Sequence, residues 1–210
     1  NYLSILEKSF SVNYKKIHNR GFGSAHNTAY KSYNLNKKYK YHLIINPDVE
    51  FKKNTIKELV SYLDKNNEVG AIMPQVRNFD DTLQFARRCL PSPMHLIMKR
   101  LFPNSKTAIE YEIKNLEPTK PIQLIGLCGC FMIIRNSVIN NNEIFDERFF
   151  MYFEDFDLSI RMGKLGEVVY APDVQIIHDG GNAAGKGGWH IRKFTESGLK
   201  FFKTHGWRWT

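Results

Sequence analysis

The stretch YHLIINPDVEFKKNTIKELVSYLDKNNEVGAIMPQV, residues 41–76, carries the strongest indication of the fold. Leu43–Ile45 has the apolar character of a buried strand, and Pro47 ends it because proline cannot donate a hydrogen bond to a sheet. A helix is predicted next, with Asn54 as its N-cap and apolar residues at helical spacing. VGAIMPQV forms a second predicted strand. Strand, helix and strand in succession predict an α/β protein whose parallel strands are joined by a crossover helix.

The rest of the chain predicts more elements of the same kinds. The segment from Leu90 to Pro121 contains five prolines, so we expect loops there around one short helix, MHLIMKRLF. No internal repeat or low-complexity tract is present, and we expect a single domain over residues 1–210. The other predicted elements are a helix at Ala25–Tyr33, a strand IQLIGLCGCFMIIR, a helix EDFDLSIRMGKLG ending at Gly166, a strand EVVYAPDVQIIH and a helix WHIRKFTESGLKFFKTHG.

The composition is that of a folded, basic protein. Hydrophobic residues make up 42% of the chain, and 30 Lys and Arg against 21 Asp and Glu give a net charge of +9. Such a charge attracts nucleic acid, nucleoside diphosphates or anionic lipid headgroups without choosing among them. The three cysteines are too few for a disulfide framework, and we expect Cys128 and Cys130 to be inert thiols on one face of a strand. No apolar run approaches the roughly 20 residues of a membrane span.

The segment FFMYFEDFDLSIR, residues 149–161, places three acids behind an aromatic run. One interpretation is helix capping, because Glu154 and Asp155 would occupy the first turn of a helix, where the helix dipole favours acids. Asp157 and Arg161 would then form an i, i+4 ion pair. The other interpretation is a catalytic base, since a carboxylate beside a packed apolar wall has a raised pKa. The local sequence leaves both open.

A glycine-rich turn, NRGFGSAHN, precedes the first predicted helix. Gly21 and Gly23 permit positive φ and close approach of the backbone, and the N-terminus of the helix that follows suits a phosphate or a nucleotide. The dinucleotide-binding fingerprint is excluded, because His26 stands at the position of its third glycine. An ordinary tight turn is the alternative.

Two further segments place ligand-type side chains at the ends of predicted strands. In IINPDV, Asn46 and Asp48 offer oxygen atoms to a hard cation just past a buried strand, although Pro-Asp also occurs in simple turns. His178 ends the strand EVVYAPDVQIIH, where it could bind a metal, contact a phosphate or serve the fold alone. Five glycines between Gly180 and Gly188 follow it and favour a loop that closes over a substrate.

The order of these segments is more specific than any one of them. N-x-GFG-x-x-x-N, NPD after a strand, G-x-C-G-x-F-M-x-I-R, FDERFFMYFEDFDLSIR and YAPDVQIIH together closely resemble the inverting family 2 glycosyltransferases. The nearest similarity is to their bacterial rhamnosyltransferase-like and galactofuranosyltransferase-like branch, from Asn19 to about His205. The resemblance implies a GT-A fold, in which a mixed, mainly parallel, Rossmann-like central sheet is flanked by helices.

An activity is implied by the same resemblance. A sugar would pass from a nucleotide-sugar donor to a saccharide or lipid-linked saccharide acceptor during synthesis of a bacterial surface polysaccharide, with a divalent cation, Mg²⁺ or Mn²⁺, and without a nucleic-acid partner. A cytoplasmic location follows. The basic, apolar segment MHLIMKRLF fits peripheral contact with the inner face of the cell membrane, and it equally fits packing in the core or in the acceptor pocket.

Residue roles follow from matches to the family's motifs. Asp155 matches the catalytic base, and Glu154 would orient it or hold acceptor hydroxyls, with the aromatic residues before it as the wall of the acceptor site. Asp48 matches the position that binds the metal and the donor diphosphate, with Asn46 nearby. His178 matches the strand-end histidine that some members use as a further metal ligand.

The donor site is assigned in the same way. Arg88, or Arg87 beside it, would clamp the diphosphate or face solvent. The family normally opens with a strand, a helix and a second strand that bind the base and the ribose, whereas only a short stretch precedes Asn19 in this chain. We therefore expect the usual N-terminal strands to be lacking here. The residues that match the nucleotide pocket are Asn19, Gly21, Phe22, Gly23 and Asn27.

Two other functions compete with this one. A pI near 9.4 and 13% aromatic residues would suit a non-catalytic nucleic-acid-binding module, but most aromatic residues here lie in apolar runs. A metal-dependent phosphodiesterase would use Asp48, Asp155, Asp157 and His178, and it would need them in one cluster of carboxylates.

Overall fold

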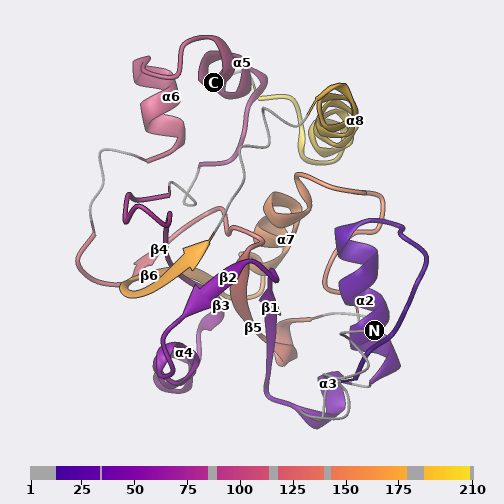
Figure 1. The fold of residues 1–210 in the computed structure, drawn as a ribbon, viewed down its shortest axis with the longest axis vertical. Helices are drawn as coiled ribbons and strands as arrows, with labels where there is room; N and C mark the ends of the chain where they lie inside the picture. The colour runs from indigo at the N-terminus through magenta and orange to yellow at the C-terminus, as the bar shows by residue number, and fades with distance from the viewer. Residues whose placement is uncertain are drawn as a thin grey trace.

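The computed structural model describes residues 13–33, 35–84, 89–113, 118–139, 143–178 and 187–208. A central sheet is flanked by helices (Figure 1). The strands are β1 (Tyr41–Ile45), β2 (Val49–Phe51), β3 (Val69–Arg77), β4 (Ile122–Gln123), β5 (Phe131–Arg135) and β6 (Glu167–His178). The helices are α2 (Phe22–Ser32), α3 (Leu35–Lys38), α4 (Thr55–Lys65), α5 (Pro93–Leu101), α6 (Lys106–Tyr111), α7 (Glu154–Met162) and α8 (Gly188–His205).

The sheet is mixed, with the strand order β1-β5-β3-β6-β2 and with β4 beside β6. The mixed α/β class is confirmed. β1 and β3 run in the same direction, as a crossover unit predicts, but β5 lies between them and is antiparallel to both. The expectation of mainly parallel pairing is wrong for the described strands. Among these, β3 and β6 form the single parallel pair, because β2, β4 and β5 run in the opposite direction.

The chain between β1 and β2 positions the candidate site. β1 stands at one edge of the strand order and β2 at the other, and Asn46 and Asp48 between them both lie beside His178. Val49 then pairs with His178, the last residue of β6. The NPD segment therefore lies at the carboxyl end of β6, which is the edge where α/β sheets bind ligands.

The apolar periodicity of α4 produces the packing that it predicts. Leu59 and Leu63 are completely buried, and the helix packs on β3, β5 and β6. Arg135, at the end of β5, is also buried and donates hydrogen bonds to the carbonyl oxygens of Leu63 and Asn66. These bonds add a side-chain donor to the carbonyl groups at the end of α4, which also accept from the backbone N–H groups of Asn66 and Val69.

A second apolar cluster joins α7 and α8 to the segment before α7. Figure 1 shows α5, α6 and α8 gathered at the end of the molecule opposite α3 and α4. Phe150, Met151 and Tyr152 are half-buried, while the flanking phenylalanines of the same run are core residues. The two ends of the aromatic run before the acids are thus part of the core. The buried members of the cluster are Tyr111, Phe149, Phe153, Phe156, Phe201 and Phe202.

Several local predictions differ from the structure. The predicted strand IQLIGLCGCFMIIR is two strands, β4 and β5, with a turn at residues 129–130, because glycine weakens a strand interior. Cys128 directly precedes that turn and Cys130 lies in it, so the expectation that both stand on one face of a strand is wrong. Their Sγ atoms lie 3.5 Å apart. The helix predicted at Ala25 begins at Phe22, and α6 follows the confirmed helix α5.

The expectations about the N-terminal strands and about membrane-spanning segments concern the described residues only in part. Residues 1–12, where the usual N-terminal strands would be sought, lie outside the described residues. Within the described ranges, no helix combines the length and the apolar character needed to cross a membrane.

Candidate active site

A polar corner forms where β1 and β6 end. The Nε2 atom of His178 lies 3.5 Å from Oδ1 of Asp48 and 3.4 Å from Nδ2 of Asn46. His178 is buried, whereas about half of the Asp48 side chain is exposed. The structure thus brings together three predicted site residues that are up to 132 positions apart in the chain. The fold causes this meeting, because residues 46–48 cross the carboxyl end of β6.

This corner contains donors that fit a divalent cation. A carboxylate oxygen suits Mg²⁺ and Mn²⁺, an imidazole nitrogen is a common ligand of transition metals, and a diphosphate and water would supply the remaining ligands. In the part of the chain that the structure describes, no three His, Cys, Asp or Glu side chains are grouped to hold a metal ion by themselves. Asp48 and His178 therefore offer two donor atoms, which could hold a cation only together with further ligands.

Gln84 is a member of this corner that the sequence analysis missed. Its Oε1 atom lies 3.0 Å from Nδ1 of His178, across 94 positions of the chain. Gln84 stands in the segment after β3, where Leu83 makes a bridge with Arg77. No motif marks this glutamine, and only the tertiary contact identifies it.

The acid pair opens α7. Glu154 is buried, and its Oε2 atom has no hydrogen-bond partner in the described structure. Burial and, second, the charge of Asp155 raise the pKa of Glu154 to about 8. Asp155 is half-buried, and one of its oxygens accepts a hydrogen bond from the backbone N–H of Phe156 at 2.9 Å. Helix capping therefore describes Asp155 in part, but it does not account for Glu154, whose buried Oε2 atom has no hydrogen-bond partner in the described structure.

The backbone before the acid pair is strained and held by α8. Tyr152 and Phe153 both have positive φ, 70° and 66°, which costs of order 1–3 kcal/mol per residue. The hydroxyl of Tyr152 lies 2.7 Å from Nδ1 of His190, and the hydroxyl of Ser197 donates to the carbonyl oxygen of Met151 at 2.8 Å. These contacts, with the aromatic cluster around Phe153, hold a conformation that a free loop would leave.

The turn at residues 128–130 connects the acid pair to the polar corner. A Cβ atom placed on Gly129 would lie 3.9 Å from Cβ of Asp155 and 3.8 Å from the ring of Phe22. The carbonyl oxygen of Cys130 accepts a hydrogen bond from the backbone N–H of Asn46 at 2.9 Å. The GFG turn, the acid pair and the NPD segment therefore all lie beside residues 128–130.

The glycines of the GFG turn are required by packing. Gly21 has φ of 106°, and a Cβ atom there would lie 2.3 Å from the carbonyl oxygen of Phe150. A Cβ atom on Gly23 would lie 2.6 Å from Cβ of Phe145. Asn19 accepts a hydrogen bond from the N–H of Gly21 at 3.1 Å. The two glycines thus allow a close approach of the GFG backbone to the segment before the acid pair.

Asn27 is buried, and its amide is fully used by the protein. Its Oδ1 atom accepts from the backbone N–H groups of Ile144 and Phe145, at 2.9 and 3.0 Å. Its Nδ2 atom donates to the carbonyl oxygen of Phe145 at 2.8 Å and to Glu147 at 3.2 Å. Asn27 therefore joins α2 to the chain that leads to the acid motif. Arg88, the predicted diphosphate clamp, lies outside the described residues together with Arg87.

Residues 2–142 match the family model described as glycosyl transferase family 2. The chain belongs to this family. It is 31% identical over 150 residues to the N-acetylglucosaminyl-diphospho-decaprenol L-rhamnosyltransferase of Mycobacterium tuberculosis, an alignment that covers 69% of this chain and 48% of that protein. It is 26% identical over 165 residues to the rhamnosyltransferase WbbL of Escherichia coli, covering 75% of this chain and 61% of that one. The chain thus spans about half the length of the first of these curated relatives.

Solved structures support the GT-A fold of this family 2 chain. A crystal structure of GalNAc-T7 with UDP, GalNAc and Mn²⁺ superposes with a TM-score of 0.58 at 13% identity, covering 92% of this chain and 38% of that one. A structure of residues 1–349 of S. aureus TarS gives 0.51 at 16% identity, covering 97% and 59%. At these identities the likeness establishes the fold alone.

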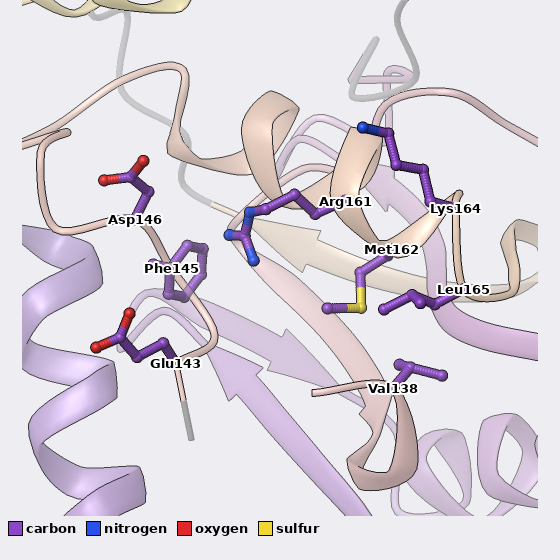
Figure 2. Close-up of a pocket in the computed structure, with 8 residues that line it drawn as sticks. All are labelled: Val138, Glu143, Phe145, Asp146, Arg161, Met162, Lys164 and Leu165. Carbon is purple, nitrogen blue, oxygen red and sulfur yellow. The ribbon is translucent and has the colours of Figure 1, made fainter. Parts of the chain in front are cut away.

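A separate hollow of about 460 Å³ lies beside the C-terminal end of α7 in the family 2 chain (Figure 2). None of its lining residues was predicted to belong to the site. Three of its four charged side chains have ion-pair partners, since Arg161 pairs with Asp157, Asp146 with Arg148, and Glu143 with Lys31. We therefore place no substrate there. The lining residues are Val138, Glu143, Phe145, Asp146, Arg161, Met162, Lys164 and Leu165.

Asp157 belongs to the scaffold of the family 2 domain. The predicted i, i+4 ion pair is confirmed, with Nε of Arg161 2.8 Å from Oδ2 of Asp157. Nε2 of His205, on α8, lies 2.8 Å from the other oxygen. Both oxygens of this buried carboxylate are therefore occupied, and the multi-carboxylate cluster of a phosphodiesterase is not formed among the described residues.

The raised pKa of Glu154 predicts how the stability of the family 2 domain depends on pH. An acid whose pKa is higher in the folded than in the unfolded chain stabilises the fold fully below its unfolded value, 4.5, and this contribution is lost as pH rises toward 8. We expect the free energy of unfolding of the wild type to fall between these pH values relative to Glu154→Gln, which is neutral throughout. Denaturant unfolding at stepped pH measures this difference, and a difference that does not change with pH contradicts it.

Proposed function

We propose that this chain is the catalytic domain of an inverting glycosyltransferase, which moves a sugar from a nucleotide-sugar donor to a saccharide acceptor in the synthesis of a polysaccharide. The observation that carries the proposal is the convergence of two groups of residues on the turn at 128–130. One is the corner of Asp48 and His178, and the other is the acid pair of Glu154 and Asp155. The first suits a diphosphate leaving group, and the second suits a hydroxyl nucleophile.

Asp155 acts as the general base in this proposal. It accepts the proton of an acceptor hydroxyl while that oxygen bonds to the anomeric carbon, and the bond from that carbon to the diphosphate breaks on the opposite face. Two neighbouring carboxylates do not both ionise easily, and burial favours the proton on Glu154. Asp155 thereby carries the negative charge, and protonated Glu154 can donate a hydrogen bond to it or to the acceptor.

Asp48 and His178 would hold Mg²⁺ or Mn²⁺, with Asn46 beside them. The bound cation supplies neutralisation of the charge that develops on the departing diphosphate. Support comes from the donor atoms of the corner and from the Mn²⁺ in the structure of GalNAc-T7, a protein of the same fold. The half-exposed carboxylate of Asp48 leaves room for a ligand, which a fully buried ion pair would not.

The acceptor is proposed to be a lipid-linked saccharide. The name of the M. tuberculosis relative gives a diphospho-decaprenol-linked saccharide as its acceptor, and the E. coli relative is also a rhamnosyltransferase. A lipid-linked acceptor requires an enzyme that reaches the membrane surface from the cytoplasmic side, where nucleotide sugars are made. Rhamnose is accordingly the first donor sugar to test.

The activity is tested by incubating the full-length protein with a panel of nucleotide sugars, with and without Mn²⁺. Release of the nucleoside diphosphate is measured with water and with a short polyprenyl-diphosphate saccharide as acceptor. We expect release to depend on the cation and to increase with the acceptor. No release from any donor, together with no cation-dependent binding of nucleotide, contradicts the proposal.

Peripheral membrane contact through α5 is part of the proposal. Met94, Ile97 and Leu101 recur at helical spacing and are exposed by 41, 49 and 64%. With a net charge of +9, this apolar face suits the surface of an anionic bilayer.

We expect the double variant Ile97→Ser, Leu101→Ser to weaken co-sedimentation with phosphatidylglycerol vesicles by about tenfold or more. Each substitution removes an apolar side chain that would be buried in the membrane, and such burial contributes about 1.5–3 kcal/mol to binding. Leu165→Ser, which removes an exposed leucine outside α5, is the matched control. Equal binding of the double variant and the wild type contradicts membrane contact through α5.

A further inference from the structure

The segment between β3 and α5 contains a chain of hydrogen bonds that ends on His178. Four side chains take part, in the order Asp80, Thr82, Asn78 and Gln84. Each bond has a donor and an acceptor, so the whole chain has a direction. That direction determines which nitrogen of His178 carries its proton.

The chain starts at Asp80, an exposed carboxylate that can only accept. The hydroxyl of Thr82 donates to it at 2.5 Å, and the backbone N–H of Thr82 donates to the same oxygen at 3.0 Å. These bonds lower the pKa of Asp80, so it is ionised at neutral pH. Because the hydroxyl proton of Thr82 is used here, its oxygen is left as an acceptor, and Nδ2 of Asn78 donates to it at 2.9 Å.

The amides of Asn78 and Gln84 continue the same direction. With Nδ2 of Asn78 turned toward Thr82, its Oδ1 atom accepts from Nε2 of Gln84 at 3.0 Å. The amide nitrogen of Gln84 is thereby fixed, and its Oε1 atom faces Nδ1 of His178 at 3.0 Å. A carbonyl oxygen cannot donate, so Nδ1 must be the protonated nitrogen.

A neutral imidazole carries a single N–H, so Nε2 of His178 presents a lone pair. That atom lies 3.4 Å from the donor Nδ2 of Asn46 and 3.5 Å from Oδ1 of Asp48. A lone pair and a carboxylate oxygen facing each other at this distance repel unless a cation or a proton lies between them. The arrangement therefore prepares two donor atoms for one positive ligand.

We propose that Gln84 is a positioning residue, which is aligned by the Asp80–Thr82–Asn78 chain and holds His178 as the Nδ1–H tautomer with Nε2 directed at Asp48. Partners of this kind are common behind histidines that bind metals, where they fix the ring and raise its basicity as a ligand. The statement about the tautomer stands by itself, and the use of Nε2 as a cation ligand rests on the proposed function.

The tautomer is measured in metal-free, ¹⁵N-labelled full-length protein. The nitrogen shifts and the long-range couplings to the ring protons distinguish Nδ1–H from Nε2–H, and loss of the His178 signals in His178→Gln assigns them. We expect Nδ1–H in the wild type, a shift of the population toward Nε2–H in Gln84→Leu, and Nδ1–H again in Gln84→Glu, which restores an acceptor oxygen. Gln123→Leu, at an exposed glutamine on β4, is the matched control and should resemble the wild type.

Mn²⁺ binding in the presence of UDP, dTDP or GDP is the second measurement. Loss of a partner behind a metal-binding histidine weakens metal affinity by about 10- to 100-fold, so we expect this for Gln84→Leu, with recovery in Gln84→Glu. An Nε2–H tautomer in the wild type, or an unchanged tautomer in Gln84→Leu, overturns the inference even if the enzyme is active. Unchanged Mn²⁺ affinity in Gln84→Leu overturns the role of Gln84 in cation binding. If the wild type and the two Gln84 variants show the expected tautomers but the wild type binds no Mn²⁺ with any diphosphate, the positioning by Gln84 holds and the cation site of the proposed function fails.

Discussion

Replacing Asp155 with asparagine is expected to lower kcat for sugar transfer by about 10²- to 10⁴-fold, which is the usual contribution of a general base. Asparagine has nearly the same shape as aspartate but cannot accept a proton. The oxygen that receives the N–H of Phe156 is retained, so the start of α7 should be preserved. The dissociation constant of the donor should change by less than about threefold, because in this mechanism the loss is confined to the transition state.

The measurement is single-turnover transfer at saturating donor, together with Mn²⁺-dependent nucleotide binding. Asp157→Asn is the comparison within the same helix, since its carboxylate is committed to Arg161 and His205. It should lower the stability of the protein and leave kcat per folded molecule much less affected. If Asp155→Asn instead abolishes Mn²⁺ binding, the acid pair belongs to a metal cluster. That result would support a metal-dependent phosphodiesterase over a glycosyltransferase.

Replacing Asn27 with leucine is expected to lower the free energy of unfolding by at least about 3 kcal/mol, because a buried polar group without its partner costs about 1–3 kcal/mol. The change leaves the N–H groups of Ile144 and Phe145 and the carbonyl of Phe145 without their side-chain partner. Together these losses are a large part of the 5–15 kcal/mol that stabilises a typical domain.

Denaturant unfolding measures this effect. Asn27→Asp keeps an oxygen for the two N–H groups but loses the donation to Phe145, so its stability should lie between those of leucine and the wild type. Thr28→Val, one position along α2, removes a hydroxyl that bonds only to the carbonyl of Ser24 in the same helix and should cost less than about 1 kcal/mol. If Asn27→Leu keeps its stability and loses nucleotide binding, the assignment of Asn27 to the donor pocket is supported instead.

Both results bear on how the acid motif is held. Asn27 ties the chain at residues 144–147 to α2, while α8 supports Met151 and Tyr152 from the other side. The acid pair thus lies at the end of a segment fixed at two places. We expect the effect of Asn27→Leu on kcat, measured where the variant is still folded, to exceed its effect on donor binding.

Local sequence was sufficient for the elements whose formation depends on neighbours in the chain. The strand at β1, the helix α4 and the strand β6 were predicted because apolar periodicity and turn residues act over a few positions. The Asp157–Arg161 pair was predicted for the same reason, since one helical turn brings the two residues together. The placement of Asp48 and His178 at strand ends followed from these elements.

Only the tertiary structure decided which distant groups meet. The direction of β5 between β1 and β3 could not be read from the apolar run that β5 shares with β4, because pairing depends on strands far along the chain. An asparagine at position 27 and a glutamine at position 84 look alike in the sequence as uncharged polar residues. The fold commits the first to backbone groups more than 110 positions away and aims the second at His178. A hydrogen-bonding side chain acquires its role from the partner that the fold supplies, and local sequence contains no information about that partner.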